Sequence, residues 1–226
     1  MPIRKTSLVN GKYYHVFNKN IDQKKSFVSR QDYQRAVTAL LFYSFKQNNH
    51  DLSKFMRLTS KSQIEFINNH HSSTVSSVIA FCLMPNHFHI LLKQIIKGGI
   101  SYHLKEFQNS YTRFLNIKQK RSGPLFLTQF KAVKIETENQ FLHVSRYIHL
   151  NPFSSNIVKS KQKLLSYPWS SLPHYLSKKT TLLQSVIDKS DTMSYFQNNP
   201  EKYKKFILDH SDHQKSLKQI QNLLLE

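Results

Sequence analysis

Met84-Pro85-Asn86-His87-Phe88-His89-Ile90-Leu91-Leu92 is the stretch of sequence that decides the fold. The ten residues up to Met84 are apolar and β-branched, and the same character resumes from His87 to Lys93. Pro85-Asn86 interrupts the run, so two strands joined by a tight turn are predicted. Because side chains alternate along a strand, His87 and His89 project from one face while Phe88 packs on the other.

Outside this hairpin, hydrophobic periodicity and Gly/Pro punctuation indicate the remaining elements. Strands are predicted over residues 13–18 and 125–135, and helices over 33–45 with Asp32 as cap, 101–120, and 137–150 with Thr137 as cap and Asn151-Pro152 as its end. Residues 47–73 are expected to form an irregular segment with room for a short helix, and residues 201–226 to form one or two charged helices. This order is typical of an α+β domain in which helices cover one side of an antiparallel sheet. We expect a main domain over residues 1–179 and a helical C-terminal extension over residues 180–226.

The charge of the chain indicates a polyanionic partner. Lys and Arg total 33 against 13 Asp and Glu, a formal charge of +20, which otherwise only adds self-repulsion. A generically basic surface is the plain alternative. No apolar stretch reaches the roughly 20 residues that span a bilayer, and no signal peptide is visible, so a cytoplasmic protein without a membrane role is expected. The single cysteine, Cys82, excludes a cysteine-based zinc cluster, and the four glycines form no phosphate-binding loop.

His87 and His89 can chelate one divalent ion, because their neutral imidazole nitrogens lie on the same face of a strand. Two ordinary surface histidines would give the same pattern.

A second candidate group closes the helix predicted over residues 137–150. Tyr147 and Asn151 are one helical turn apart and share a face. They can direct a phenolic and an amide oxygen to the same ion. The alternative is a core tyrosine and an asparagine that ends the helix.

Together the two groups favour phosphoryl-transfer chemistry. A phenol has a pKa near ~10 and needs help to act as a nucleophile at neutral pH. A metal that binds a phosphate supplies that help, and a neutral His, His and Asn ligand set leaves positions open for phosphate and water. Such a set suits Mg²⁺ or Mn²⁺, although histidine also accepts Zn²⁺ or Ni²⁺.

These motifs resemble a known family. MPNHFHILL resembles the HUH motif, and YIHLNP resembles the tyrosine helix of the REP-associated tyrosine transposases, which are related to the single-tyrosine insertion-sequence transposases. Similar blocks occur in the same order in YYHVFNKNIDQKKSFVSRQDYQRAV, GPLFLTQFKAVKI and YPWSSLPHYL, so the resemblance extends from Gly11 to Leu176.

The resemblance implies an HUH-type fold with a ferredoxin- or RRM-like core, and a metal-dependent enzyme that nicks and rejoins DNA. His87 and His89 fall on the metal-binding histidines, Tyr147 on the nucleophile that forms a 5′-phosphotyrosine, and Asn151 on the third metal ligand. The implied substrate is single-stranded DNA with a hairpin, typically a repetitive extragenic palindrome.

Several basic residues are candidate DNA contacts, although any one of them is more often simply solvated. They are Arg4, Lys5, Arg121, Lys131 and Lys134. Tyr111 is a rival nucleophile by type, but its apolar helical stripe favours core packing. His149 is expected to point away from the face of Tyr147.

Two other functions remain open. A hairpin-binding module for DNA or RNA needs the basic surface but not the His, Tyr and Asn residues, and a metal-dependent hydrolase needs no nucleophilic tyrosine. A monomer is favoured over a homodimer, because the C-terminal extension can replace contacts made by a partner subunit.

Overall fold

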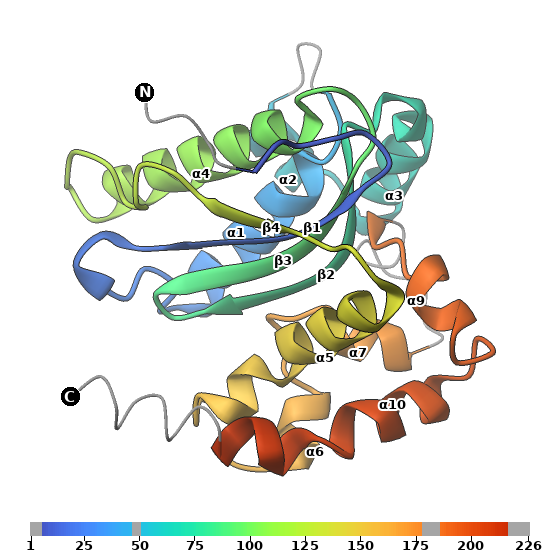
Figure 1. The fold of residues 1–226 in the computed structure, drawn as a ribbon. Coiled ribbons are helices and arrows are strands. Elements are labelled where there is room, and N and C mark those ends of the chain that lie inside the picture. The colour runs from blue at the N-terminus through green and yellow to red at the C-terminus, as the bar shows by residue number, and fades with distance from the viewer. Residues whose placement is uncertain (1–5, 47–50, 178–185, 217–226) are drawn as a thin grey trace.

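The computed structural model describes residues 6–46, 51–177 and 186–216. Its centre is a four-stranded antiparallel sheet with the strand order β2-β3-β1-β4, which confirms the α+β prediction (Figure 1). The strands are β1 (Tyr13–Lys19), β2 (Ser76–Met84), β3 (His87–Gln94) and β4 (Lys131–Lys134). The helices are η1 (Ile21–Gln23), α1 (Arg30–Phe42), α2 (Leu52–Arg57), α3 (Ser60–Asn69), η2 (His71–Ser73), α4 (Gly99–Lys118), α5 (Glu138–Ser154), α6 (Lys161–Leu165), α7 (Leu172–Leu176), α9 (Ser190–Ser194) and α10 (Pro200–Leu208).

The β2–β3 hairpin forms where the sequence predicts it. Met84 pairs with His87, so Pro85-Asn86 is a two-residue turn. β1 lies antiparallel along the other side of β3, and β4 extends the sheet beyond β1. The histidine-bearing strand is therefore an inner strand, with a fixed neighbour on each side.

One face of the sheet packs against α1 and α4 (Figure 1). The inward residues of three strands, among them Val16, Phe81 and Phe88, form the main core with Phe107 of α4. The start of α1 differs from the prediction, because Ser29 is the N-cap. Asp32 occupies position N3 of the resulting capping box, and its carboxylate accepts from the Ser29 backbone N–H.

The opposite face is covered by α5, so the expectation of helices on one side only is wrong (Figure 1). The strand residues that alternate with the main core include Cys82, Met84 and Leu91, which are themselves fully buried. An apolar sheet face needs cover, and Ile148 and Phe141 of α5 supply it.

Three element boundaries also differ from the predictions. The strand expected over residues 125–135 is confined to β4, because Leu125, Phe126 and Phe130 turn into the main core. The region after α1, expected to be irregular with room for one short helix, contains two helices, α2 and α3, among its described residues. Pro152 does not end α5, which continues to Ser154. The Ser155 N–H donates to the carbonyl of Asn151, one turn earlier, and the buried Phe153 packs into the core.

The C-terminal residues 186–216 share the main core, which includes Met193, Tyr203 and Ile207. Helix α10 packs on α5 and α7, as Figure 1 shows. The domain boundary expected near residue 180 lies outside the described residues. Within the described ranges, no helix has the length and apolar character that crossing a bilayer requires.

Candidate active site

The β2–β3 hairpin places both motif histidines on the face covered by α5. His87 stands opposite Met84 and His89 opposite Cys82, both of which belong to the core beneath α5. His89 is 8% exposed and His87 is half-buried. Their ring centroids are 5.1 Å apart. The two imidazoles therefore lie side by side on one face of the sheet, as strand alternation predicts.

Helix α5 brings Tyr147 to the same place. Its buried residues Phe141 and Ile148 fix the helix on the sheet, and Tyr147 remains half-buried at the edge of this contact. The Tyr147 ring centroid lies 5.4 Å from that of His89, with the rings edge-to-face. The structure thus joins two motifs that are nearly sixty residues apart in sequence.

His15 of β1 is a third imidazole in this cluster, which the sequence analysis missed. Its Nε2 lies 3.0 Å from Nδ1 of His89, and its ring centroid lies 5.8 Å from that of Tyr147. Burial lowers the pKa of His15 to about 4, so this imidazole is neutral near pH 7. Alternation along β1 by itself shows only that the His15 side chain lies on the other face of the strand from the buried Tyr14 and Val16. The pairing of β1 with β3, which only the fold reveals, brings it to His89.

Asn151 lies one turn after Tyr147 but is fully buried. Its Nδ2 donates to the Tyr147 backbone carbonyl at 3.3 Å. Gln214, from the C-terminal segment, donates to the same carbonyl at 3.3 Å. The contact of Asn151 with Tyr147 uses the amide nitrogen, and so it does not involve Oδ1, the atom through which an asparagine binds a metal ion.

The described ranges contain no group of three or more His, Cys, Asp or Glu side chains arranged to hold a metal ion. A metal site on this face would therefore combine the motif histidines with an uncharged oxygen donor. The imidazoles suit such an ion, because the Nδ1 atoms of His87 and His89 both have partners within 3.0 Å. A ligating histidine commonly makes a hydrogen bond of this kind through the nitrogen that does not face the metal.

The far side of α5 is held by a buried polar network. His149 Nδ1 lies 2.8 Å from the Tyr203 hydroxyl, and His149 Nε2 lies 2.7 Å from Ser171 Oγ. Ser145 Oγ lies 2.6 Å from the same Tyr203 hydroxyl. Burial lowers the pKa of His149 to about 3. As expected, His149 points away from Tyr147, and it links α5 to α10.

The rival nucleophile Tyr111 is a core residue. It is fully buried on α4, on the opposite side of the sheet, and its hydroxyl donates to the Ser26 carbonyl at 2.9 Å. Burial raises its pKa well above the ordinary value. The interpretation of Tyr111 as a packing residue is confirmed.

The candidate DNA contacts are spread over different parts of the chain. Lys131 stands opposite Phe17 in the sheet, on the face that carries the histidines. Lys134 stands opposite Tyr14, on the other face, and pairs with Glu136 at 2.9 Å. Arg121 follows α4 and donates to the Pro124 carbonyl at 3.0 Å within its own loop. Arg4 and Lys5 lie outside the described residues.

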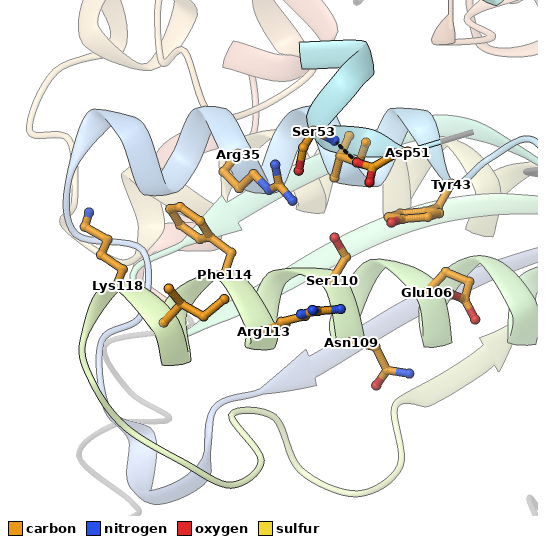
Figure 2. Close-up of a pocket in the computed structure, with 12 residues that line it drawn as sticks. Arg35, Tyr43, Asp51, Ser53, Glu106, Asn109, Ser110, Arg113, Phe114 and Lys118 are labelled. Atoms are coloured by element: carbon orange, nitrogen blue, oxygen red, sulfur yellow. Dashed lines mark hydrogen bonds between the residues drawn. The ribbon is translucent and has the colours of Figure 1, made fainter. Parts of the chain in front are cut away.

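A cavity of about 750 Å³ lies away from this cluster, between α1, α2 and α4. Figure 2 shows Arg35 facing Phe114 and Arg113 across it, with Lys118 at one end. Its lining contains no residue of α5 or of the four strands. The histidine–tyrosine cluster is therefore separate from this cavity.

Residues 43–151 match the model of a family described as "Transposase IS200 like". The matched segment contains both motif histidines, Tyr147 and Asn151, and it ends at Asn151. Over these residues the chain is similar to the IS200-like transposases. His15 precedes the matched segment and the α10 contacts follow it, so the structure adds both to the residues around Tyr147.

A solved structure has a similar fold: "Structure of the REP associates tyrosine transposase bound to a REP hairpin". The TM-score is 0.56 at 14% sequence identity, over 79% of this chain and 87% of that chain. Among curated proteins, no sequence matches this chain.

Proposed function

We propose that this protein is a transposase that nicks and rejoins single-stranded hairpin DNA, through a covalent 5′-phosphotyrosine at Tyr147, in a reaction that depends on a divalent metal. The observation that carries the proposal is the position of the Tyr147 ring, 5.4 Å from the ring of His89, on the sheet face that also holds His87. A nucleophile beside paired neutral imidazoles is what metal-assisted attack on a phosphate requires.

The roles follow from the donor atoms. His87 and His89 would hold Mg²⁺ or Mn²⁺ through imidazole nitrogens, and Asn151 would contribute its amide oxygen. When bound, the ion would polarise the scissile phosphate and stabilise the charge that develops on its oxygens. The packing of Phe141 and Ile148 on the sheet holds α5, and therefore the Tyr147 hydroxyl, at a fixed distance from the histidines.

The covalent step exchanges one phosphodiester bond for another. The Tyr147 oxygen bonds to phosphorus and its phenolic proton is lost, while the bond from phosphorus to the 3′-oxygen breaks and that oxygen takes up a proton. Religation is the reverse attack by a 3′-hydroxyl, which restores the phenol. No oxidation and no external energy source are involved.

The positive charge of the protein is consistent with a hairpin DNA partner. The chain carries a formal charge of +20, and Lys131 lies on the same sheet face as the histidines. Phosphate contacts hold a strand irrespective of its sequence, and half-buried aromatic rings such as Phe17 offer surfaces on which unpaired bases can stack.

A labelled-hairpin assay tests the proposal. Single-stranded hairpin DNA from around the gene, labelled at the 5′ or 3′ end, is incubated with Mg²⁺ or Mn²⁺ and analysed under denaturing conditions. A covalent adduct is expected that is absent in Tyr147→Phe and in the His87→Ala/His89→Ala double variant. Cleavage without an adduct would indicate a hydrolase, and binding without cleavage would indicate a hairpin-binding module; either outcome rejects the proposal.

We further propose that the site works within one subunit. Tyr147 meets the histidines of its own sheet, and its helix is packed by Tyr203 and Gln214 of the same chain. Mixing Tyr147→Phe protein with the double histidine variant tests this proposal, because a site shared between subunits would regain adduct formation. No recovery is expected.

A further inference from the structure

We propose that His15 and Asn86 are positioning residues that hold the metal-binding histidines in one tautomer, so that His89 and His87 both present Nε2 to the ion. The inference rests on the proposed function in taking these two histidines as ligands. It adds two residues with no metal contact of their own, one of them outside the family segment.

The geometry of His15 and His89 is that of a direct ring-to-ring hydrogen bond. The nitrogens are 3.0 Å apart, and the ring planes differ by 27°. The ring centroids are 5.2 Å apart, farther than the nitrogens by about one ring diameter. The two nitrogens therefore point at each other along one line, as in a hydrogen bond, instead of converging on a shared ion.

The direction of this bond sets the tautomer of His89. The bonded atom of His89 is Nδ1. If Nδ1 donates its hydrogen to Nε2 of His15, the lone pair of His89 resides on Nε2. The strand pairing stabilises this arrangement, because β1 and β3 hold both backbones in register from Tyr13 to Lys19.

Asn86 acts on His87 in the same way. Its Oδ1 lies 2.7 Å from Nδ1 of His87, and its Nδ2 donates to the Gln23 carbonyl at 3.2 Å. The second bond fixes the orientation of the amide, so the atom that faces His87 is an oxygen, which can only accept. Nδ1 of His87 therefore carries the hydrogen, and its lone pair resides on Nε2.

Two other histidines, both fully buried, are held through both ring nitrogens. His103 contacts Ser76 Oγ and the Leu40 carbonyl, and His149 contacts Ser171 and Tyr203. These imidazoles are structural. In His87 and His89 the contact described above is made through Nδ1 in both rings, and Nδ1 is the nitrogen that is bonded elsewhere when a histidine binds a metal through Nε2.

The first test measures tautomers by ¹⁵N NMR of the metal-free protein at pH 7.5, where neither DNA nor metal takes part. His87 and His89 are expected as Nδ1–H tautomers in the wild-type protein. In His15→Phe, which keeps a ring but removes the acceptor, His89 should shift toward Nε2–H, and His87 should not change. An Nε2–H tautomer for His89 in the wild-type protein would overturn the inference, whatever the outcome of the adduct assay.

The second test measures Mn²⁺ affinity by calorimetry. Loss of an orienting partner weakens metal binding by about 10- to 100-fold, so that loss is expected for His15→Phe and for Asn86→Leu. His15→Gln and Asn86→Asp, which restore an oxygen acceptor, should recover much of it, and the exposed His71→Gln serves as the matched control. Equal affinity in all these variants contradicts the positioning role, as do three nitrogen ligands in the Mn²⁺ electron–nuclear double resonance spectrum, which would make His15 a ligand.

Discussion

The two faces of the sheet are built from the same strands but serve different ends. In β1, Tyr14 and Val16 enter the core beneath α1 and α4, while His15 and Phe17 face α5. In β3, Phe88 lies on the first face, and the two motif histidines lie on the second. Strand alternation thus separates the main core from the histidine face one residue at a time. On the first face a substitution should affect stability. On the second face it should affect stability at buried apolar residues such as Leu91 and catalysis at the two histidines.

The largest expected effect distinguishes the two tyrosines. Tyr147→Phe should reduce adduct formation at least about a thousandfold, because no other group replaces the nucleophile. Its free energy of unfolding should change little, since Tyr147 is only half-buried. Tyr111→Phe should retain the adduct but lose about 1–2 kcal/mol of stability with the Ser26 hydrogen bond. Adduct yield and urea unfolding of both variants are the measurements, and an adduct in Tyr147→Phe would remove the distinction.

The next effect is confined to the core face. Phe107 is fully buried on α4 and packs against Phe88 at a centroid distance of 5.4 Å. Phe107→Ala should reduce the free energy of unfolding by about 3–5 kcal/mol through the cavity it leaves. Ile117→Ala on the same helix is the control, since Ile117 is 72% exposed and should change stability by less than about 0.5 kcal/mol. Similar losses for both would show that α4 is not packed as described.

Acid should destabilise both faces through their structural histidines. Burial lowers the pKa of His103 to about 4 and that of His149 to about 3. Both values lie below the unfolded pKa of 6.5, so this stability is present above pH 6.5 and is lost as the pH falls, when the unfolded chain binds the protons. At pH 5 the loss is about 2 kcal/mol for each histidine. Urea unfolding at pH 7.5, 6 and 5 measures it, and a constant stability over this range would disprove the buried neutral state.

The smallest effect compares two lysines of β4. Lys131 lies on the histidine face, whereas Lys134 lies on the other face and pairs with Glu136. Lys131→Ala should weaken hairpin binding several-fold for any sequence and reduce the salt slope by about one phosphate contact. Lys134→Ala should have a smaller effect on both hairpin binding and the salt slope. Binding titrations at several salt concentrations test the pair, and equal effects would mean that DNA does not follow the histidine face.

Local sequence patterns predicted the elements that bear chemistry. The apolar runs interrupted by Pro85-Asn86 sufficed for the hairpin, and a four-residue spacing sufficed to place Asn151 one turn after Tyr147. Cys82 is buried, as its apolar neighbours indicate. These features depend on residues close in sequence, where periodicity carries the information.

Features that depend on distant residues were missed. The role of His15 follows from the pairing of β1 with β3, which brings together residues more than seventy positions apart. The cover of the second sheet face follows from the packing of α5. The strand predicted over residues 125–135 was too long, because apolar residues that turn into a core look like strand residues in sequence. None of these is encoded within one local window.

The packing of Tyr203 beneath α5 has a genetic consequence. A stop codon between positions 152 and 203 would leave residues 43–151, which match the family model, and every proposed catalytic residue encoded. It would nevertheless remove the hydroxyl that His149 and Ser145 share, and with it the support behind the tyrosine helix. Gene copies that are shortened at the 3′ end should therefore be inactive relics that retain intact motifs. The count of intact copies in a genome should be based on the codons of α10 as well as on the motifs.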